Sequence, residues 1–336
     1  MFGKRMSLAT GWFAVAVAAL LIVFAGHQRA QAEPVVWKGI TPWPKTLIYS
    51  SGFFHLQKKI AEMMPDKLEL KYLGASEVYP QKAQYAALKD GAVDVSLLAA
   101  SYYKGQLPVA SANQFTNQGP TVLRANGYYD LMRKLHLDRG GVIYLMKSGV
   151  VPRGEFQVYS KKPITMIDDF KGLKIRAFGN VVPMMKALGA TPVVVSTGEM
   201  YTALERGVVD AIAYGRMGSI NFGLHEISKY ILKQYFFAQS SAVLVNLNSW
   251  NKLSKADQNK LDQVAVETEL GLKAFLEGQY VIEDDKLREK GVKFTTFKLA
   301  ADAAKFNAAA RDAGWNAIIA KDPEIGAKLR KLGYKE

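Results

Sequence analysis

The sequence predicts an α/β protein built from two lobes, and three observations support this fold class. Apolar strands alternate with short helical patterns through residues 169–213, and the same alternation extends over most of the remaining chain. A much longer helical pattern covers residues 254–289. Strands that alternate with helices in this way are joined by crossovers, so mostly parallel sheets are expected.

The elements expected before residue 169 follow from hydrophobic periodicity and from turn residues. Pro65 ends the first amphipathic helix, because proline lacks the N–H group that would continue it. Strands are expected at 46–50, 67–73, 93–99, 142–147 and 156–160, and helices at 53–64, 81–88 and 123–135.

From residue 169 onward, glycines mark the ends of the short helices. Gly189 and Gly207 each follow a helical pattern, at the position where a left-handed cap is common. Strands are expected at 173–176, 191–195, 208–213, 242–247 and 292–297, and helices at 181–188, 197–206 and 254–289, followed by two C-terminal helices.

The N-terminus has the pattern of an export signal. Lys4 and Arg5 precede an unbroken apolar run at residues 12–25, and Ala30-Gln31-Ala32 has the small-x-small form of a cleavage site. We therefore expect residues 1–32 to be a signal peptide, cleaved after Ala32, and the mature protein to be periplasmic. An uncleaved membrane anchor is the alternative, although the run is shorter than the ~20 residues that span a bilayer.

Composition excludes several classes of protein. The chain has no cysteine, which rules out a lipid-anchored cysteine, thiolate catalysis and cysteine metal sites. Its net charge of +14 comes from dispersed lysines and arginines rather than from long like-charge runs, so no nucleic-acid partner is expected. A positive field of this kind raises the encounter rate with anionic solutes.

Arg176 is the strongest candidate for ligand binding. It ends the predicted strand 173–176, and ligands of open α/β sheets bind beyond the carboxyl ends of strands. Its planar guanidinium group suits a carboxylate or a phosphate held by two hydrogen bonds. The alternative is a structural ion pair, for instance with Glu199 or Asp210.

Signals of catalysis are poor. None of the four histidines lies in an HExxH motif, and no pair has metal-ligand spacing. Residues 101–104 and 249–252 match SxxK, but the companion motifs of penicillin-binding enzymes are absent. We expect no catalytic residue, metal or cofactor. The alternative is an exported hydrolase or transferase with Ser101 as nucleophile and Lys104 as base.

Three blocks of sequence resemble the solute-binding proteins of tripartite ATP-independent periplasmic (TRAP) transporters, dicarboxylate/organic-acid-binding family. They are DFKGLKIR at 169–176, KALGATPV at 186–193 and EMYTALERGVVD at 199–210. A weaker resemblance covers residues 46–297. It implies a type II periplasmic binding-protein fold, in which two α/β lobes enclose a ligand cleft and a long helix bridges them. One lobe would comprise 33–153 plus 242–278 and the other 154–241 plus 279–336, with hinges near Gly154 and 240–241.

In the family that the chain resembles, the arginine equivalent to Arg176 forms a salt bridge with the ligand's carboxylate. The sequence departs from the family pattern at 213–216, where Ala-Tyr-Gly-Arg replaces the common Glu-Asn-Pro. We expect Tyr214 to donate to a carboxylate or to stack on an apolar ligand; a core tyrosine is the alternative. Arg216 is either a second cation or a surface residue at a helix start. Phe156 stands where sialic-acid-binding relatives carry a second arginine, which argues against a sialic acid.

The first lobe is expected to contribute from the turns at 50–55 and 99–103, because both follow predicted strands. Their candidate site residues are Ser51, Phe53, Tyr102 and Tyr103, and Phe178 would add a further wall beyond Arg176. The alternative for each aromatic side chain is ordinary packing. So many aromatic residues beside one carboxylate clamp point to an aromatic or apolar monocarboxylate.

Together these features predict an exported solute receptor that performs no chemistry. It would capture a small organic acid in the cleft, close around it, and dock on integral membrane TRAP permease subunits, a partner that the resemblance implies. Besides the hydrolase or transferase, a ligand-binding lobe that feeds a sensor kinase is the remaining alternative.

Overall fold

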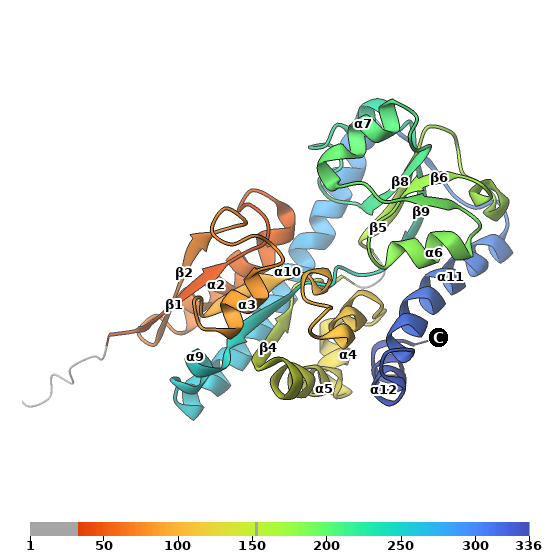
Figure 1. The fold of residues 1–336 in the computed structure, drawn as a ribbon. Coiled ribbons are helices and arrows are strands. Elements are labelled where there is room, and N and C mark those ends of the chain that lie inside the picture. Colours follow the sequence, from red (N-terminus) through yellow and green to blue (C-terminus); the bar gives the residue numbers. More distant parts are fainter. Residues whose placement is uncertain (1–32, 152–153, 336) are drawn as a thin grey trace, which may run out of the picture.

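The computed structural model describes residues 33–151 and 154–335, which form two sheets side by side (Figure 1). The first sheet has the strand order β2-β1-β3-β10-β4, and the second β11-β9-β5-β8-β6-β7. The first sheet contains β1 (Val35–Ile40), β2 (Leu68–Gly74), β3 (Val95–Leu98), β4 (Val142–Lys147) and β10 (Ala242–Asn246). The second contains β5 (Phe156–Ser160), β6 (Lys174–Arg176), β7 (Thr191–Val193), β8 (Ala211–Gly215), β9 (Tyr230–Phe236) and β11 (Lys293–Thr295).

In each sheet, one strand is antiparallel to both of its neighbours, and this strand comes, in chain order, directly after a strand of the other sheet. β10 is antiparallel to both β3 and β4, and β5 is antiparallel to both β8 and β9. The remaining pairs are parallel, as the alternation of strands and helices predicted. The expected α/β class is therefore confirmed, with mixed sheets.

The helices also follow the predicted order, with one difference in the first lobe. The expected helix at 123–135 is broken into α4 and α5, because Gly127 adopts a left-handed conformation with φ 85°. The helices around the first sheet are α2 (Ser51–Met63), α3 (Gln84–Lys89), α4 (Pro120–Ala125), α5 (Tyr128–Leu135) and α9 (Leu247–Asn251). Those around the second are α6 (Val181–Ala187), α7 (Met200–Glu205) and α8 (Leu224–Ile227).

Two strand predictions need correction. Residues 46–50 do not form a strand; Ile48–Ser50 is a short 3-10 helix, and the first strand is β1, which pairs with β2 and β3. β9 was not expected at all. It carries Lys233 and Gln234 on its outer part, so its alternation is weak in the sequence, and its pairing with β5 and β11 establishes it as a strand.

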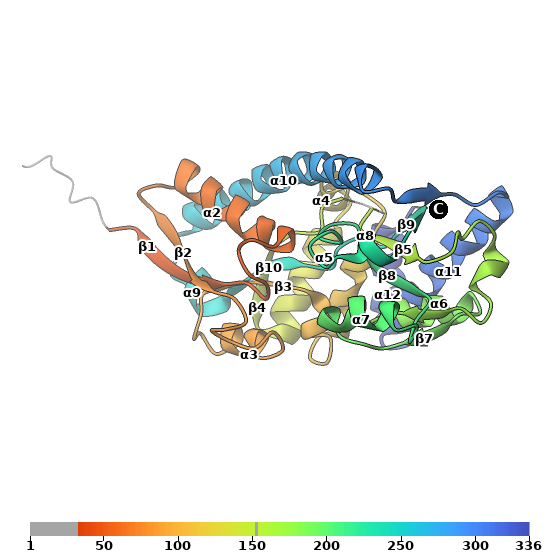
Figure 2. The ribbon, with the colours of Figure 1, turned by 90° about the horizontal axis from the view of Figure 1, so that it is seen from above.

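The long predicted helix is present as α10 (Lys255–Glu289), which lies along both halves of the molecule (Figure 2). Its first turn is capped by the Ser254 hydroxyl, which accepts from the Asp257 N–H at 3.1 Å. Leu261 and Leu272 pack in the first lobe's core, whereas Leu287 packs in the second lobe's core. One continuous helix therefore contributes side chains to both cores.

Two further connections cross between the sheets, and they lie against each other. The Ser148 N–H donates to the Ser241 carbonyl at 2.8 Å, and the Glu155 N–H donates to the Phe237 carbonyl at 3.3 Å. A Cβ atom at Gly149 would lie 1.8 Å from the Gln239 carbonyl oxygen, so only glycine permits this approach.

The C-terminal helices connect the lobes on a second side. α11 (Ala300–Ile319) begins against α6 and the 3-10 helix Ile167–Phe170, where Phe306 packs on Phe170. It ends in the first lobe, where Trp315 packs on Phe115. α12 (Pro323–Gly333) then packs on α5 and on the 3-10 helix Pro108–Gln114. The predicted boundary placed 279–336 in the second lobe, but α12 packs on the first, because a 20-residue helix is long enough to reach across. The other lobe boundaries stay a prediction.

Candidate ligand-binding site

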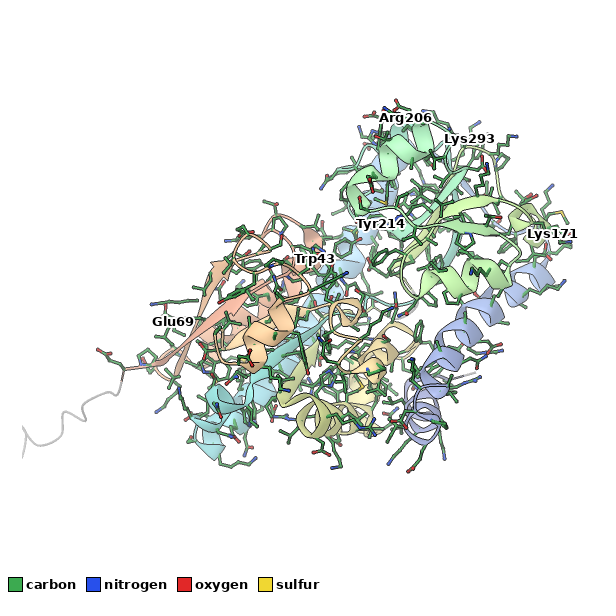
Figure 3. All side chains as sticks on the ribbon, in the orientation of Figure 1. Trp43, Glu69, Lys171, Arg206, Tyr214 and Lys293 are labelled. Carbon is green, nitrogen blue, oxygen red and sulfur yellow. The ribbon has the colours of Figure 1, made fainter. Side chains whose placement is uncertain are left out.

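A cavity of about 320 Å³ lies between the two lobes, in the size range of small-molecule sites. Trp43 of the first lobe and Tyr214 of the second lie at the facing sides of this region (Figure 3). The lining residues with a polar or aromatic role come from both lobes: Trp43, Tyr49, Gln81, Ser101, Tyr102, Gln114, Glu155, Phe156, Arg176, Phe178, Asn180, Ser196, Thr197, Tyr214, Gln239 and Ser240.

Arg176 is the last residue of β6, and its side chain lines this cavity while only 4% of the residue is exposed. Its Nε donates to the Val195 carbonyl at 3.2 Å, and its guanidinium lies beside the Tyr214 ring. Burial lowers the pKa of the guanidinium, because the charged form has lost water and gained no anion.

The two suggested ion-pair partners of Arg176 are engaged elsewhere. Glu199 accepts from the Ser196 N–H at 2.9 Å and from its hydroxyl at 2.6 Å, and Asp210 accepts from the Lys174 N–H at 3.2 Å. Within residues 33–151 and 154–335, no carboxylate forms an ion pair with Arg176. The structural ion pair is therefore not formed, and the terminal nitrogens remain open to the cavity.

Three of the expected aromatic residues line the same cavity. Tyr214 is half-buried and makes an edge-on contact with Phe222, and Phe178 is 48% exposed at the rim. Tyr102 of the first lobe packs beside Trp43, with 6.0 Å between ring centroids. Together with Arg176, they give the cavity one cationic group beside apolar walls.

Two other expected wall residues are in the core instead. Phe53 is fully buried and packs on Phe54 and Tyr72, because the first turn of α2 faces the sheet. Tyr103 is also fully buried; it stacks on Tyr85 at 4.7 Å and its hydroxyl shares a 3.1 Å hydrogen bond with His136. The packing alternative therefore holds for both, and neither lines the cavity.

Arg216 and Ser51 are also outside this cavity. The Arg216 guanidinium donates to Asp284 at 3.1 Å and lies between the rings of Tyr235 and Tyr280, so it joins the end of β8 to α10. The expected second cation is thus a buried structural ion pair. Ser51 lines a neighbouring void of about 20 Å³, little larger than one water molecule.

Several lining residues were missed by the sequence analysis. Glu155 stands between the proposed hinge residue Gly154 and β5; it is 4% exposed, and burial raises its pKa to about 7. Asn180 was placed in a turn, and its side-chain amide donates to Gln114 at 2.8 Å, which links the lobes. Both could have been predicted as lining residues from their positions: Glu155 is a polar residue next to a predicted hinge, and Asn180 is one shortly after a predicted strand end.

Ser101, the serine of the first SxxK match, lines the cavity, whereas its proposed base, Lys104, does not. Lys104 is exposed, and in the described part of the chain no hydrogen bond connects it to Ser101. No helix among the described residues has both the length and the apolar character needed to cross a membrane.

Two α/β lobes, a bridging helix and a buried, unpaired arginine in the cavity between the lobes define the class of two-lobed solute receptors. The chain belongs to family 7 of the bacterial extracellular solute-binding proteins, whose family model matches residues 41–321. This is a family of transport receptors that includes the TRAP solute-binding proteins, and it is not an enzyme family. The resemblance noted in the sequence is thereby confirmed.

The chain is also similar to individual proteins of this kind. It is 29% identical to the monocarboxylate 2-oxoacid-binding periplasmic protein of Nostoc sp., over 72% of this chain and 68% of that one. It is 27% identical to the C4-dicarboxylate-binding periplasmic protein of Rhodobacter capsulatus, over 75% and 77%. A TRAP solute-binding protein of Desulfovibrio salexigens with bound orotic acid superposes with a TM-score of 0.74 at 23% identity, covering 88% and 96%. The type II two-lobed fold is therefore confirmed.

Proposed function

We propose that this protein captures a small organic acid in the inter-lobe cavity and delivers it to TRAP permease subunits in the membrane. The observation that carries the proposal is Arg176, a buried guanidinium group with no anionic partner in the described chain. Burying an unpaired charge is costly, so a site that retains one is suited to a ligand that supplies the opposite charge. The acids named for the relatives from Nostoc sp. and Desulfovibrio salexigens support this reading.

The ligand class is a monocarboxylate with an apolar or aromatic body. Arg176 is the only cationic side chain lining the cavity among the described residues, because Arg216 is paired with Asp284 outside it. Trp43, Tyr102 and Tyr214 supply flat apolar surfaces on which a ring or a hydrocarbon body packs.

Binding would work by closure of the lobes. A ligand held by Arg176 from the second lobe also touches Trp43 and Tyr102 from the first, so the closed form gains contacts that the open form lacks. The described parts of the two crossings, residues 148–151 with 154–155 and residues 237–241, would serve as the hinge, and α10 would stay packed on both lobes.

The test is to identify the ligand that the protein carries. The full chain is expressed with its own N-terminal segment, purified without refolding and denatured, and the released compound is measured by mass spectrometry. We expect an acid with one carboxylate, recovered unchanged after incubation with the protein. A neutral or cationic compound, or a compound converted during incubation, would contradict the proposal; N-terminal sequencing of the same sample tests cleavage after Ala32.

A further inference from the structure

The cavity contains a second buried charge, of opposite sign to Arg176. Glu155 lines both this cavity and the neighbouring small void, and its Oε2 accepts a short hydrogen bond from the Tyr280 hydroxyl of α10. Its Oε1 is buried and has no hydrogen-bond partner. The nearby Tyr49 hydroxyl donates instead to the Met217 carbonyl at 2.9 Å.

Glu155 and Arg176 lie at one edge of the second sheet. β6 is parallel to β8, with Arg176 beside Ile212, whereas β5 is antiparallel to β8, with Phe156 beside Gly215. The end of β6, the end of β8 and the start of β5 therefore meet at the same edge. Neighbouring strands are about 4.8 Å apart and successive residues rise about 3.3 Å along a strand. Glu155 lies beside Arg216, four residues beyond Ile212, so the backbones that carry the two charges are two strands and four residues, about 16 Å, apart.

Tyr214 lies on β8, between these two strands. A ligand whose carboxylate meets Arg176 and whose body lies along Tyr214 thus points its far end toward Glu155. This separation of charges matches a small acid that carries a second polar group at the end opposite its carboxylate.

We propose that Glu155 determines specificity: it selects acids with a hydroxyl or N–H donor at the end away from the carboxylate, and it rejects dicarboxylates. This inference rests on the proposed function and names its substrate class more narrowly. A donor satisfies the orphan Oε1, whereas a second carboxylate would meet a like charge in a site poor in water.

The groups around Glu155 do not remove this discrimination. Tyr280 from α10 and Tyr49 from the first lobe are neutral hydroxyls, and burial raises the pKa of each. Arg216, after β8, favours the ionised form of Glu155 from a distance but forms its ion pair with Asp284. Burial outweighs these neighbours, so the pKa of Glu155 is about 7 and its charge depends on pH around neutrality.

The experiment compares matched probes by calorimetric titration at about pH 8.5, where a group with a pKa near 7 is ionised. One set is benzoate, 4-hydroxybenzoate and terephthalate; the other is butanoate, 4-aminobutanoate and succinate. The proteins are wild type, Glu155→Gln, and Glu283→Gln as the control. Glu283 lies on α10, the helix that carries Tyr280. Its side chain accepts a hydrogen bond from the Ser219 hydroxyl at 3.0 Å, but it does not line the cavity.

For the wild type, we expect the donor-bearing acid to bind at least about tenfold more tightly than the dicarboxylate of the same set. Glu155→Gln should reduce this ratio to within about threefold, mainly by tighter dicarboxylate binding, whereas Glu283→Gln should preserve it. If Glu155→Gln does not fold, the wild type at about pH 5.5 serves instead, because protonation of Glu155 should reduce the same ratio.

Equal binding of donor acids and dicarboxylates by the wild type would overturn the inference, as would a ratio unchanged by both Glu155→Gln and acid pH. In either case, if binding still depends on Arg176, the proposed function stands. Failure of every acid in both sets to bind the wild type would overturn the proposed function and the selectivity together.

Discussion

The guanidinium carbon of Arg176 lies 5.7 Å from the centre of the Tyr214 ring. Arg176 pairs with Ile212 across β6 and β8, so Tyr214, two residues further along β8, lies on the same face of the sheet. The ring covers one side of the cation, while the Val195 carbonyl holds its Nε. Arg176 is thus held in a fixed orientation with its terminal nitrogens free for a ligand.

Arg176→Ala should weaken acid binding by about 2–5 kcal/mol, because the ligand's carboxylate would be left buried and unpaired. This corresponds to a loss of affinity of roughly thirtyfold to several thousandfold. Arg176→Lys should recover only part of it, since an ammonium cannot reproduce the planar fork. Calorimetric titration measures the effect, with Arg206→Ala, an exposed site, as the control. Near-wild-type affinity in Arg176→Ala would contradict the assignment of Arg176 as the residue that binds the carboxylate.

Alanine substitutions at Phe178 and Phe53 should have opposite effects, because Phe178 lines the cavity and Phe53 is in the core. Phe53→Ala removes a fully buried ring, so the free energy of unfolding should fall by about 3–5 kcal/mol, with little change in the affinity of the folded protein. Phe178→Ala, at 48% exposure, should change stability by less than about 0.5 kcal/mol but weaken binding. Denaturant unfolding and calorimetric titration of both variants check this. Weaker binding in Phe53→Ala together with a large loss of stability in Phe178→Ala would contradict both assignments.

Gly149→Ala should destabilise the protein by about 1–3 kcal/mol, because the new methyl group would collide with the Gln239 carbonyl in the second crossing segment. Gly105→Ala, where nothing lies within 4 Å of the added Cβ, should cost less than about 0.5 kcal/mol. Urea unfolding of both variants measures the difference. Equal stabilities would mean that the crossing segments separate easily.

The raised pKa of Glu155 predicts a pH dependence of unfolding. Its folded pKa is about 7 against an ordinary 4.5, so the stability it contributes is full below about 4.5 and is lost as pH rises through 7. The total change is on the order of 3 kcal/mol. Glu155→Gln lacks this titration, so its unfolding free energy relative to wild type should rise between about pH 5 and pH 8. A constant difference over that range would contradict the assignment.

Ligand should compact the protein by closing the lobes about the two crossing segments. Small-angle scattering with and without a saturating acid should show a smaller radius of gyration at an unchanged molecular mass. The Arg176→Ala variant, at the same acid concentration, is the control and should not compact. An unchanged radius for the wild type at saturation would count against closure.

Most elements of the fold were predictable because their signals are local. Strands β4 and β5 have the bounds expected from alternation. α10 ends at the expected Glu289 and begins one residue later than expected, because Ser254 is its N-cap. Strand β9 and the break at Gly127 were missed, because a half-exposed strand and a single glycine leave weak local patterns. The position of Arg176 at the end of β6 also follows from local pattern, and its placement in the cavity agrees with the strand-end rule.

By itself, then, the sequence determined the class of fold, the family and the arginine at the strand end. Only the tertiary structure decided which side chains face the cavity. Phe53 and Tyr103 face the core, and Arg216 meets Asp284, a residue 68 positions away. Glu155, absent from the expected site, has an oxygen with no partner. The physical reason is that periodicity shows which face of a helix or strand is buried. Which residues a buried side chain contacts depends on the distant elements that pack against that face.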